Sequence, residues 1–184
     1  MLKHLFFVAV VLVLAGCWDA DLRHTLYLES NGEVAWQLQV TELEVPEEPG
    51  EVERRLNELW LGTDSISETL FEMGALSVET TVLREKAPLS YVFQARFASI
   101  GPVLEALFEE VPELSWREEW TKQGRTLSFQ LSDEIGDQTR ADFPVVELIG
   151  AEAGLVSGTE PSKLLRLSTP EDWAAIKIQW REPQ

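Results

Sequence analysis

The stretch "LRHTLYLESNGEVAWQLQVTEL", from Leu22 to Leu43, contains two similar halves around a turn. Large side chains recur at every second position of both halves: Leu22, His24, Leu26, Leu28, Val34, Trp36, Leu38 and Val40. A period of two gives a strand one buried face and one solvated face. Asn31-Gly32 lies between the halves and is a strong hairpin signal, because both residues tolerate a positive φ angle. We therefore predict two antiparallel strands joined by a tight turn.

The same pattern of paired strands returns twice toward the C-terminus. One pair is expected over residues 76–82 and 91–97, and another over residues 116–120 and 127–131. Helical spacing of apolar side chains separates the pairs, over residues 52–60, 65–73 and 104–111. The first two of these segments form either a helix pair or one kinked helix. The order ββαββαββ, ending near Ser132, predicts an α+β fold: an antiparallel sheet of hairpins with helices packed on one face.

The pattern weakens after Ser132. Residues 163–168 and 175–180 are expected to form two more strands, and the Gly- and Ala-rich segment before them is interpreted as loop or short helix. The sequence shows no composition shift that would mark a second domain. Residues 22–184 are therefore predicted to form a single α+β domain, in which the third hairpin ends near residue 132.

The N-terminal segment has the pattern of an export signal. Lys3 precedes an apolar run from Leu5 to Ala15, which is shorter than the roughly 20 residues that a membrane-spanning helix needs. Leu14-Ala15-Gly16-Cys17 resembles the bacterial lipobox, and this resemblance implies that diacylglycerol is attached to Cys17 and that residues 1–16 are removed. The alternatives are a plain signal peptide with an incidental cysteine and an uncleaved signal anchor.

Cys17 is the sole cysteine of the chain, so it is expected to carry lipid rather than a disulfide. Each buried methylene of an acyl chain contributes about 0.8 kcal/mol, so two or more chains anchor a protein firmly. Residues 17–21 are then a lipidated N-terminus and short tether. The expected location is the cell membrane, with the domain facing outside the cytoplasm.

The composition limits the partners and the chemistry. The net charge of −17 disfavours nucleic acid and anionic lipid headgroups as binding surfaces. His24 is the sole histidine after the signal, and we interpret it as a buried, hydrogen-bonded core residue. No G-x-S-x-G motif, phosphate-binding loop or zinc-ligand spacing is present. We therefore expect no catalytic residue, metal site or cofactor. A carboxylate-based hydrolase is the least favoured alternative, and a weak divalent-cation site on the acidic surface stays open.

Tryptophans are the candidates for contact with an apolar ligand or a partner. The four selected residues are Trp36, Trp60, Trp116 and Trp120. Ordinary core packing is the competing interpretation for each of them. Trp116, Glu118 and Trp120 share one strand face, so exposure of that face would create an aromatic patch.

The arrangement resembles the LppM-like lipoprotein domain over about Cys17 to Leu131. The likeness lies in a lipobox cysteine leading into "DADLRHTLYLESNGEVAWQLQV", a helix ending at "LFEMGA", and a strand pair closing on "FQARFAS". Many members carry a C-terminal transmembrane helix, whereas this sequence ends in "KIQWREPQ". The resemblance implies a membrane-tethered, non-enzymatic binding module for lipid or another apolar ligand. The alternative is an interaction subunit of an envelope complex with no ligand pocket.

Overall fold

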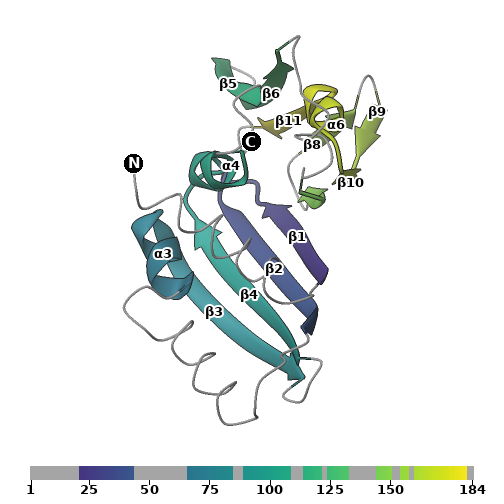
Figure 1. The fold of residues 1–184 in the computed structure, drawn as a ribbon. Helices are drawn as coiled ribbons and strands as arrows, with labels where there is room; N and C mark the ends of the chain where they lie inside the picture. Colours follow the sequence, from purple (N-terminus) through teal and green to yellow (C-terminus); the bar gives the residue numbers. More distant parts are fainter. Residues whose placement is uncertain are drawn as a thin grey trace.

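The computed structural model describes residues 21–43, 66–84, 89–108, 114–121, 124–132, 144–150, 154–157 and 160–181. Within these ranges, eleven strands outnumber three short helices, which confirms the mixed α+β class (Figure 1). The strands form two sheets, so the expectation of a single sheet is wrong. The signal segment, Cys17 and the predicted helix over 52–60 with Trp60 lie outside the described residues. The full ββαββαββ order includes such segments and stays a prediction.

The larger sheet has the strand order β10-β7-β1-β2-β4-β3. Its strands are β1 (Asp21–Leu28), β2 (Val34–Leu43), β3 (Ala75–Arg84), β4 (Leu89–Phe97), β7 (Val146–Gly150) and β10 (Leu164–Leu167). The predicted strand pairs β1–β2 and β3–β4 are antiparallel, as expected. The pairing of β1 with β7 is parallel, so the sheet is mixed and the prediction of a purely antiparallel sheet is wrong. A parallel neighbour requires a long connection, and here most of the chain lies between β1 and β7.

The turn between β1 and β2 is a loop of Ser30, Asn31 and Gly32 rather than the two-residue turn that Asn-Gly suggests. The Glu29 N–H donates to the Glu33 carbonyl at 3.0 Å, and the Gly32 N–H donates to the Glu29 carbonyl at 3.2 Å. Gly32 has a φ of 88°, which side chains with a Cβ rarely adopt. This geometry matches the common hairpin loop that ends in a left-handed glycine.

The smaller sheet has the strand order β5-β6-β11-β8-β9. Its strands are β5 (Leu114–Thr121), β6 (Gly124–Leu131), β8 (Gly154–Ser157), β9 (Glu160–Ser162) and β11 (Ile176–Arg181). The predicted third hairpin is therefore the start of a second sheet. Three short strands, β7, β8 and β9, fall in or beside the segment interpreted as loop or short helix, and that interpretation is wrong. The pairing of β7 with β1 and of β8 with β11 depends on strands that are distant in the sequence, whereas β9 pairs with the adjacent β8.

The three described helices are α3 (Ile66–Glu72), α4 (Gly101–Leu107) and α6 (Pro170–Ala174). Gly74, with a φ of 95°, closes α3, and its N–H donates to the Phe71 carbonyl at 2.9 Å. Helix α3 contacts β3 of the larger sheet (Figure 1), and α6 contacts β6 of the smaller sheet and β10 of the larger sheet. The expectation that the predicted helices share one face of a sheet stays a prediction.

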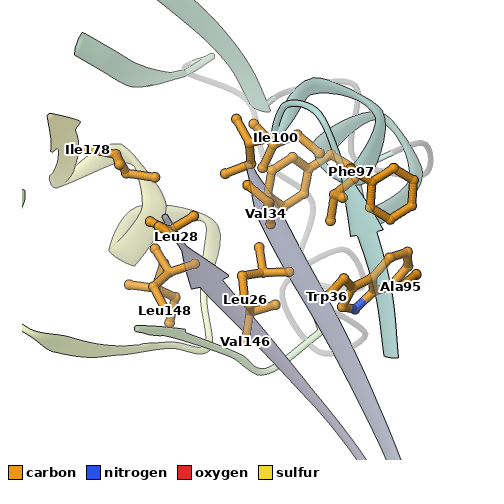
Figure 2. Close-up of a cluster of buried hydrophobic side chains, with 14 of the residues drawn as sticks. Leu26, Leu28, Val34, Trp36, Ala95, Phe97, Ile100, Val146, Leu148 and Ile178 are labelled. Carbon is orange, nitrogen blue, oxygen red and sulfur yellow. The ribbon is translucent and has the colours of Figure 1, made fainter. Parts of the chain in front are cut away.

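One continuous group of buried apolar side chains links the two sheets. Figure 2 shows Leu26 and Leu28 of β1, Val34 and Trp36 of β2, and Ile178 of β11 among these side chains. The strand register places core side chains of neighbouring strands side by side: Leu28 lies opposite Val34, and Val34 lies opposite Phe97. An edge-to-face ring cluster of Phe108, Phe129 and Trp173 continues the core under the smaller sheet.

Candidate functional site

The register of the smaller sheet brings two tryptophans and an arginine into one row. Trp120 of β5 lies opposite Arg125 of β6, and Arg125 lies opposite Trp180 of β11. Opposite residues in an antiparallel pair share a face and have neighbouring side chains. The three residues therefore form a cross-strand group, which we call the Trp120–Arg125–Trp180 stack.

The guanidinium of Arg125 lies between the two indole rings. Its Cζ atom is 4.5 Å from the ring centroid of Trp180 and 5.5 Å from that of Trp120. A cation within about 6 Å of a tryptophan centroid is attracted to the negative ring face. Glu118 of β5 forms an ion pair with the Arg125 Nε atom. The charge of Arg125 is thus accommodated by two ring faces and one carboxylate, although only 10% of its side chain is exposed.

The turn of the β1–β2 hairpin, in the larger sheet, contacts the stack. The Trp180 Nε1–H donates to the carbonyl oxygen of Glu29 at 2.9 Å. A Cβ atom placed on Gly32 would lie 3.0 Å from the Arg125 Nη1 atom, so the turn approaches the guanidinium closely. The stack therefore joins the two sheets as well as supporting Trp120.

Trp120 itself is the most exposed large apolar side chain in the described residues, with a relative exposure of 74%. One part of its ring covers Arg125, and the rest faces solvent. The contact with Arg125 restrains the ring before anything binds to it. Because tryptophan and arginine are enriched where binding energy concentrates between proteins, Trp120 is a candidate contact residue.

Trp36 has a structural role in the larger sheet. Its side chain is buried, and its Nε1–H donates to the Nδ1 atom of His24 at 3.2 Å. The two rings stack with centroids 5.8 Å apart. Burial lowers the pKa of His24 to about 4, so the ring is neutral near pH 7 and accepts the hydrogen bond. The interpretation of His24 as a buried, hydrogen-bonded core residue is confirmed.

The four candidate tryptophans are not gathered in one place. Trp36 belongs to the larger sheet, and Trp116 and Trp120 belong to β5 of the smaller sheet. Trp116 is half-buried, with its ring 6.3 Å from that of Phe108. Trp60 lies outside the described residues. Of these candidates, Trp120 is the one whose side chain the described structure leaves open to solvent.

Several described carboxylates have structural partners. Glu118 pairs with Arg125, and Glu119 lies 3.4 Å from the Arg117 Nε atom, so this neighbouring pair is divided between two arginines. Burial acts to raise the pKa of Asp172, but hydrogen bonds from Ser168 and Thr169 outweigh it and hold that pKa below its usual value. A general acid needs a raised pKa instead. Asp172 therefore serves the N-terminus of α6.

Within the described ranges, no group of three or more His, Cys, Asp or Glu side chains is arranged to hold a metal ion. None of the described helices combines the length and the apolar character needed to cross a membrane.

Sequence reasoning selected Trp120 but missed Arg125 and Trp180. The hairpin register contained a signal for Arg125, because Trp120 and Arg125 flank the turn at matching positions. Trp180 had no such signal, since β6 and β11 are far apart in the sequence and their pairing follows from the tertiary structure.

Comparison of the chain with protein-family models, with curated proteins and with solved structures finds no match in any of the three. The resemblance to the LppM-like lipoprotein domain therefore rests on the sequence pattern alone and stays a prediction.

Proposed function

We propose that this protein is a lipid-anchored, non-enzymatic interaction module that faces outside the cytoplasm and contacts an envelope protein through Trp120. The observation that carries this proposal is the position of Trp120, which is 74% exposed while its ring is held against Arg125. Restraining an aromatic side chain in advance lowers the entropy cost of binding. Cys17 supplies the anchor in this proposal, and the LppM-like resemblance is consistent with it.

A protein partner is favoured over a lipid ligand for two reasons. The described tryptophan candidates are divided between two sheets, and an acyl-chain pocket would need them to converge. The net charge of −17 also opposes the binding of anionic lipid headgroups. Tryptophan and arginine are, by contrast, the residues most enriched where binding energy concentrates between proteins.

Site-specific cross-linking in intact cells tests the contact. A benzophenone-bearing amino acid replaces Trp120 in one variant and Glu105, an exposed residue of α4, in the control variant. We expect one discrete protein adduct from position 120 and none from position 105. Absence of an adduct at position 120, equal labelling at both positions, or adducts with lipid alone would contradict the proposal.

The anchor is tested separately. Cys17→Ala should move the protein from the membrane fraction to the soluble fraction, because the acyl chains would have no thiol to carry them. Retention of the variant in the membrane would exclude lipidation as the anchor. Native mass spectrometry of the extracted wild-type protein addresses the lipid alternative: a non-covalent lipid at fixed stoichiometry would favour a carrier over an interaction module.

A further inference from the structure

The two open sheets end in four edge strands among the described residues: β10, β3, β5 and β9. An edge strand presents unpaired backbone N–H and C=O groups to whatever approaches it. Folded proteins usually protect such edges with short strands, prolines or charged side chains. The protection of these four edges is unequal.

Three of the edges carry a recognisable protection. Strand β9 has three residues and includes Pro161, which lacks a backbone N–H. Strand β10 has four residues. Strand β5 is longer, but Arg117, Glu118 and Glu119 follow one another in its middle. On each of these edges, an added strand would find either few backbone groups to pair with or several consecutive charged side chains.

Strand β3 differs from the other three. It has ten residues, and its charged residues are Glu79 in the middle and Arg84 at the end. Its regular pairing with β4 runs from Ser77 to Val82, between register shifts at the two ends. Leu76 and Leu83, at these shifts, are 60% and 54% exposed. The edge is thus long, rich in β-branched side chains and weakly charged.

We propose that β3 is a strand-addition site for an extended segment of a partner protein in which apolar and basic side chains alternate. An added strand would pair its backbone with the outward-facing groups of β3, as in other cases of β-augmentation. This inference concerns the opposite sheet from Trp120 and does not depend on the function proposed above.

The alternation follows from the two faces of β3. Val78 lies opposite Ala95, and Val82 lies opposite Tyr91, so both valines lie on the buried face of the larger sheet. Val82 is nevertheless 42% exposed, because the apolar face reaches the edge there. Glu79 points to the other face and is exposed. An added strand would place apolar side chains beside the valines and a basic side chain beside Glu79.

Charge complementarity favours a positively charged partner segment. Helix α3 and strand β3 together contain three glutamates, Glu68, Glu72 and Glu79, and one arginine, Arg84, at the end of β3. The whole chain has a net charge of −17, which steers cationic segments toward it. The same charge opposes pairing of β3 with β3 of a second copy, since two strongly acidic molecules would have to meet.

A peptide-binding assay on the full-length protein in detergent tests this proposal. The probe is a fluorescent peptide of alternating lysine and valine, and its anisotropy reports binding. Two control peptides carry glutamate in place of lysine, or N-methyl groups on every backbone amide. We expect binding of the lysine–valine peptide alone, because the first control reverses the charge and the second cannot form the strand hydrogen bonds.

Matched protein variants locate the site. Glu79→Lys should weaken binding of the lysine–valine peptide by about tenfold or more, whereas Glu105→Lys on α4 makes the same charge change elsewhere and should leave it within about twofold. Both side chains are exposed, so circular dichroism should show unchanged folding. Equal weakening by the two variants, or equal binding of the N-methylated peptide, would reduce the effect to general charge attraction and overturn the proposal. Absence of binding by the lysine–valine peptide would also overturn the proposal. So would self-association of the wild-type protein, if Glu79→Lys abolished it.

Discussion

Each of the two sheets contains one basic side chain beside tryptophan: His24 in the larger sheet and Arg125 in the smaller sheet. The histidine is neutral, whereas the arginine is charged. In the larger sheet, His24 is 7% exposed and accepts a hydrogen bond from Trp36. In the smaller sheet, Arg125 lies between Trp120 and Trp180 and pairs with Glu118. Histidine enters the core as a neutral ring, whereas arginine enters as a cation.

The difference follows from the intrinsic pKa values of the two groups. Burial disfavours a charged imidazole and lowers the pKa of His24 to about 4, so the ring is neutral near pH 7 and its Nδ1 atom accepts the hydrogen bond from Trp36. A guanidinium stays protonated in proteins. The protein must then surround the charge with ring faces and a carboxylate. Proton loss allows deep burial, whereas a permanent charge is held at the border of the sheet.

The largest expected effect tests the neutral state of His24. Its pKa is about 4 in the folded protein against 6.5 when unfolded, so between these values only the unfolded state takes up the proton. Stability is therefore lost as the pH falls from about 6.5 to about 4, by a total of about 3 kcal/mol from this group. Urea unfolding at pH 7 and pH 4 measures this loss.

His24→Leu is the reference variant for that measurement. It removes the titrating imidazole but keeps the carboxylates, whose protonation also changes stability between pH 7 and pH 4. The variant should be less stable at pH 7, since Trp36 loses its acceptor, but should lose about 3 kcal/mol less than wild type on acidification. Equal losses in the two proteins would show that His24 takes up its proton in the folded state.

The next effect tests the charge of Arg125. Arg125→Leu removes the contacts with both rings and leaves Glu118 without its partner, so we expect a loss of about 2 kcal/mol in the free energy of unfolding. Arg117→Leu on β5 is the control, because the Arg117 side chain is 69% exposed and its pair with Glu119 is on the surface. That control should change stability by less than about 0.5 kcal/mol. Similar losses of stability in both variants would show that the contacts of Arg125 with the two rings contribute little to stability.

A smaller effect tests the junction between the two regions. Gly32→Ala should cost about 1 kcal/mol, because alanine is strained at a φ of 88° and its Cβ would approach Arg125. Thermal unfolding measures the loss. Gly101→Ala is the matched control, since the nearest atom to its Cβ would be Ser99 Oγ at 3.9 Å and its φ is not positive. A neutral Gly32→Ala would indicate that the turn and the stack move apart without cost.

The smallest effect concerns Trp120. Trp120→Ala should reduce stability by only about 0.5 kcal/mol, because an exposed cation–π contact is weak and most of the ring is already in water. Leu164→Ala, at 57% exposure, is the control for loss of an exposed apolar side chain. A loss above about 2 kcal/mol from Trp120→Ala would indicate that this residue belongs to the core and would weaken its assignment as a contact residue.

The success of the sequence analysis differs between strand pairs that are close in the sequence and strand pairs that are distant. The hairpins β1–β2 and β3–β4 were predictable, because short connections and alternating side chains encode them locally. The division into two sheets was not, because it depends on pairings such as β1 with β7 and β6 with β11. Helix α6 was missed although Thr169-Pro170 starts it and Asp172 completes a capping box, a pattern readable from sequence.

The sequence by itself determined the strand alternation, the hairpin turn at Gly32, the burial of His24 and the selection of Trp120. These features depend on residues close together in the chain, where the period of two and the glycine φ angle act directly. Only the tertiary structure decided that Arg125 lies between Trp120 and Trp180 and that β3 is the least protected edge. Both depend on which distant strands pair, and that choice is made by the burial of apolar faces over the whole molecule.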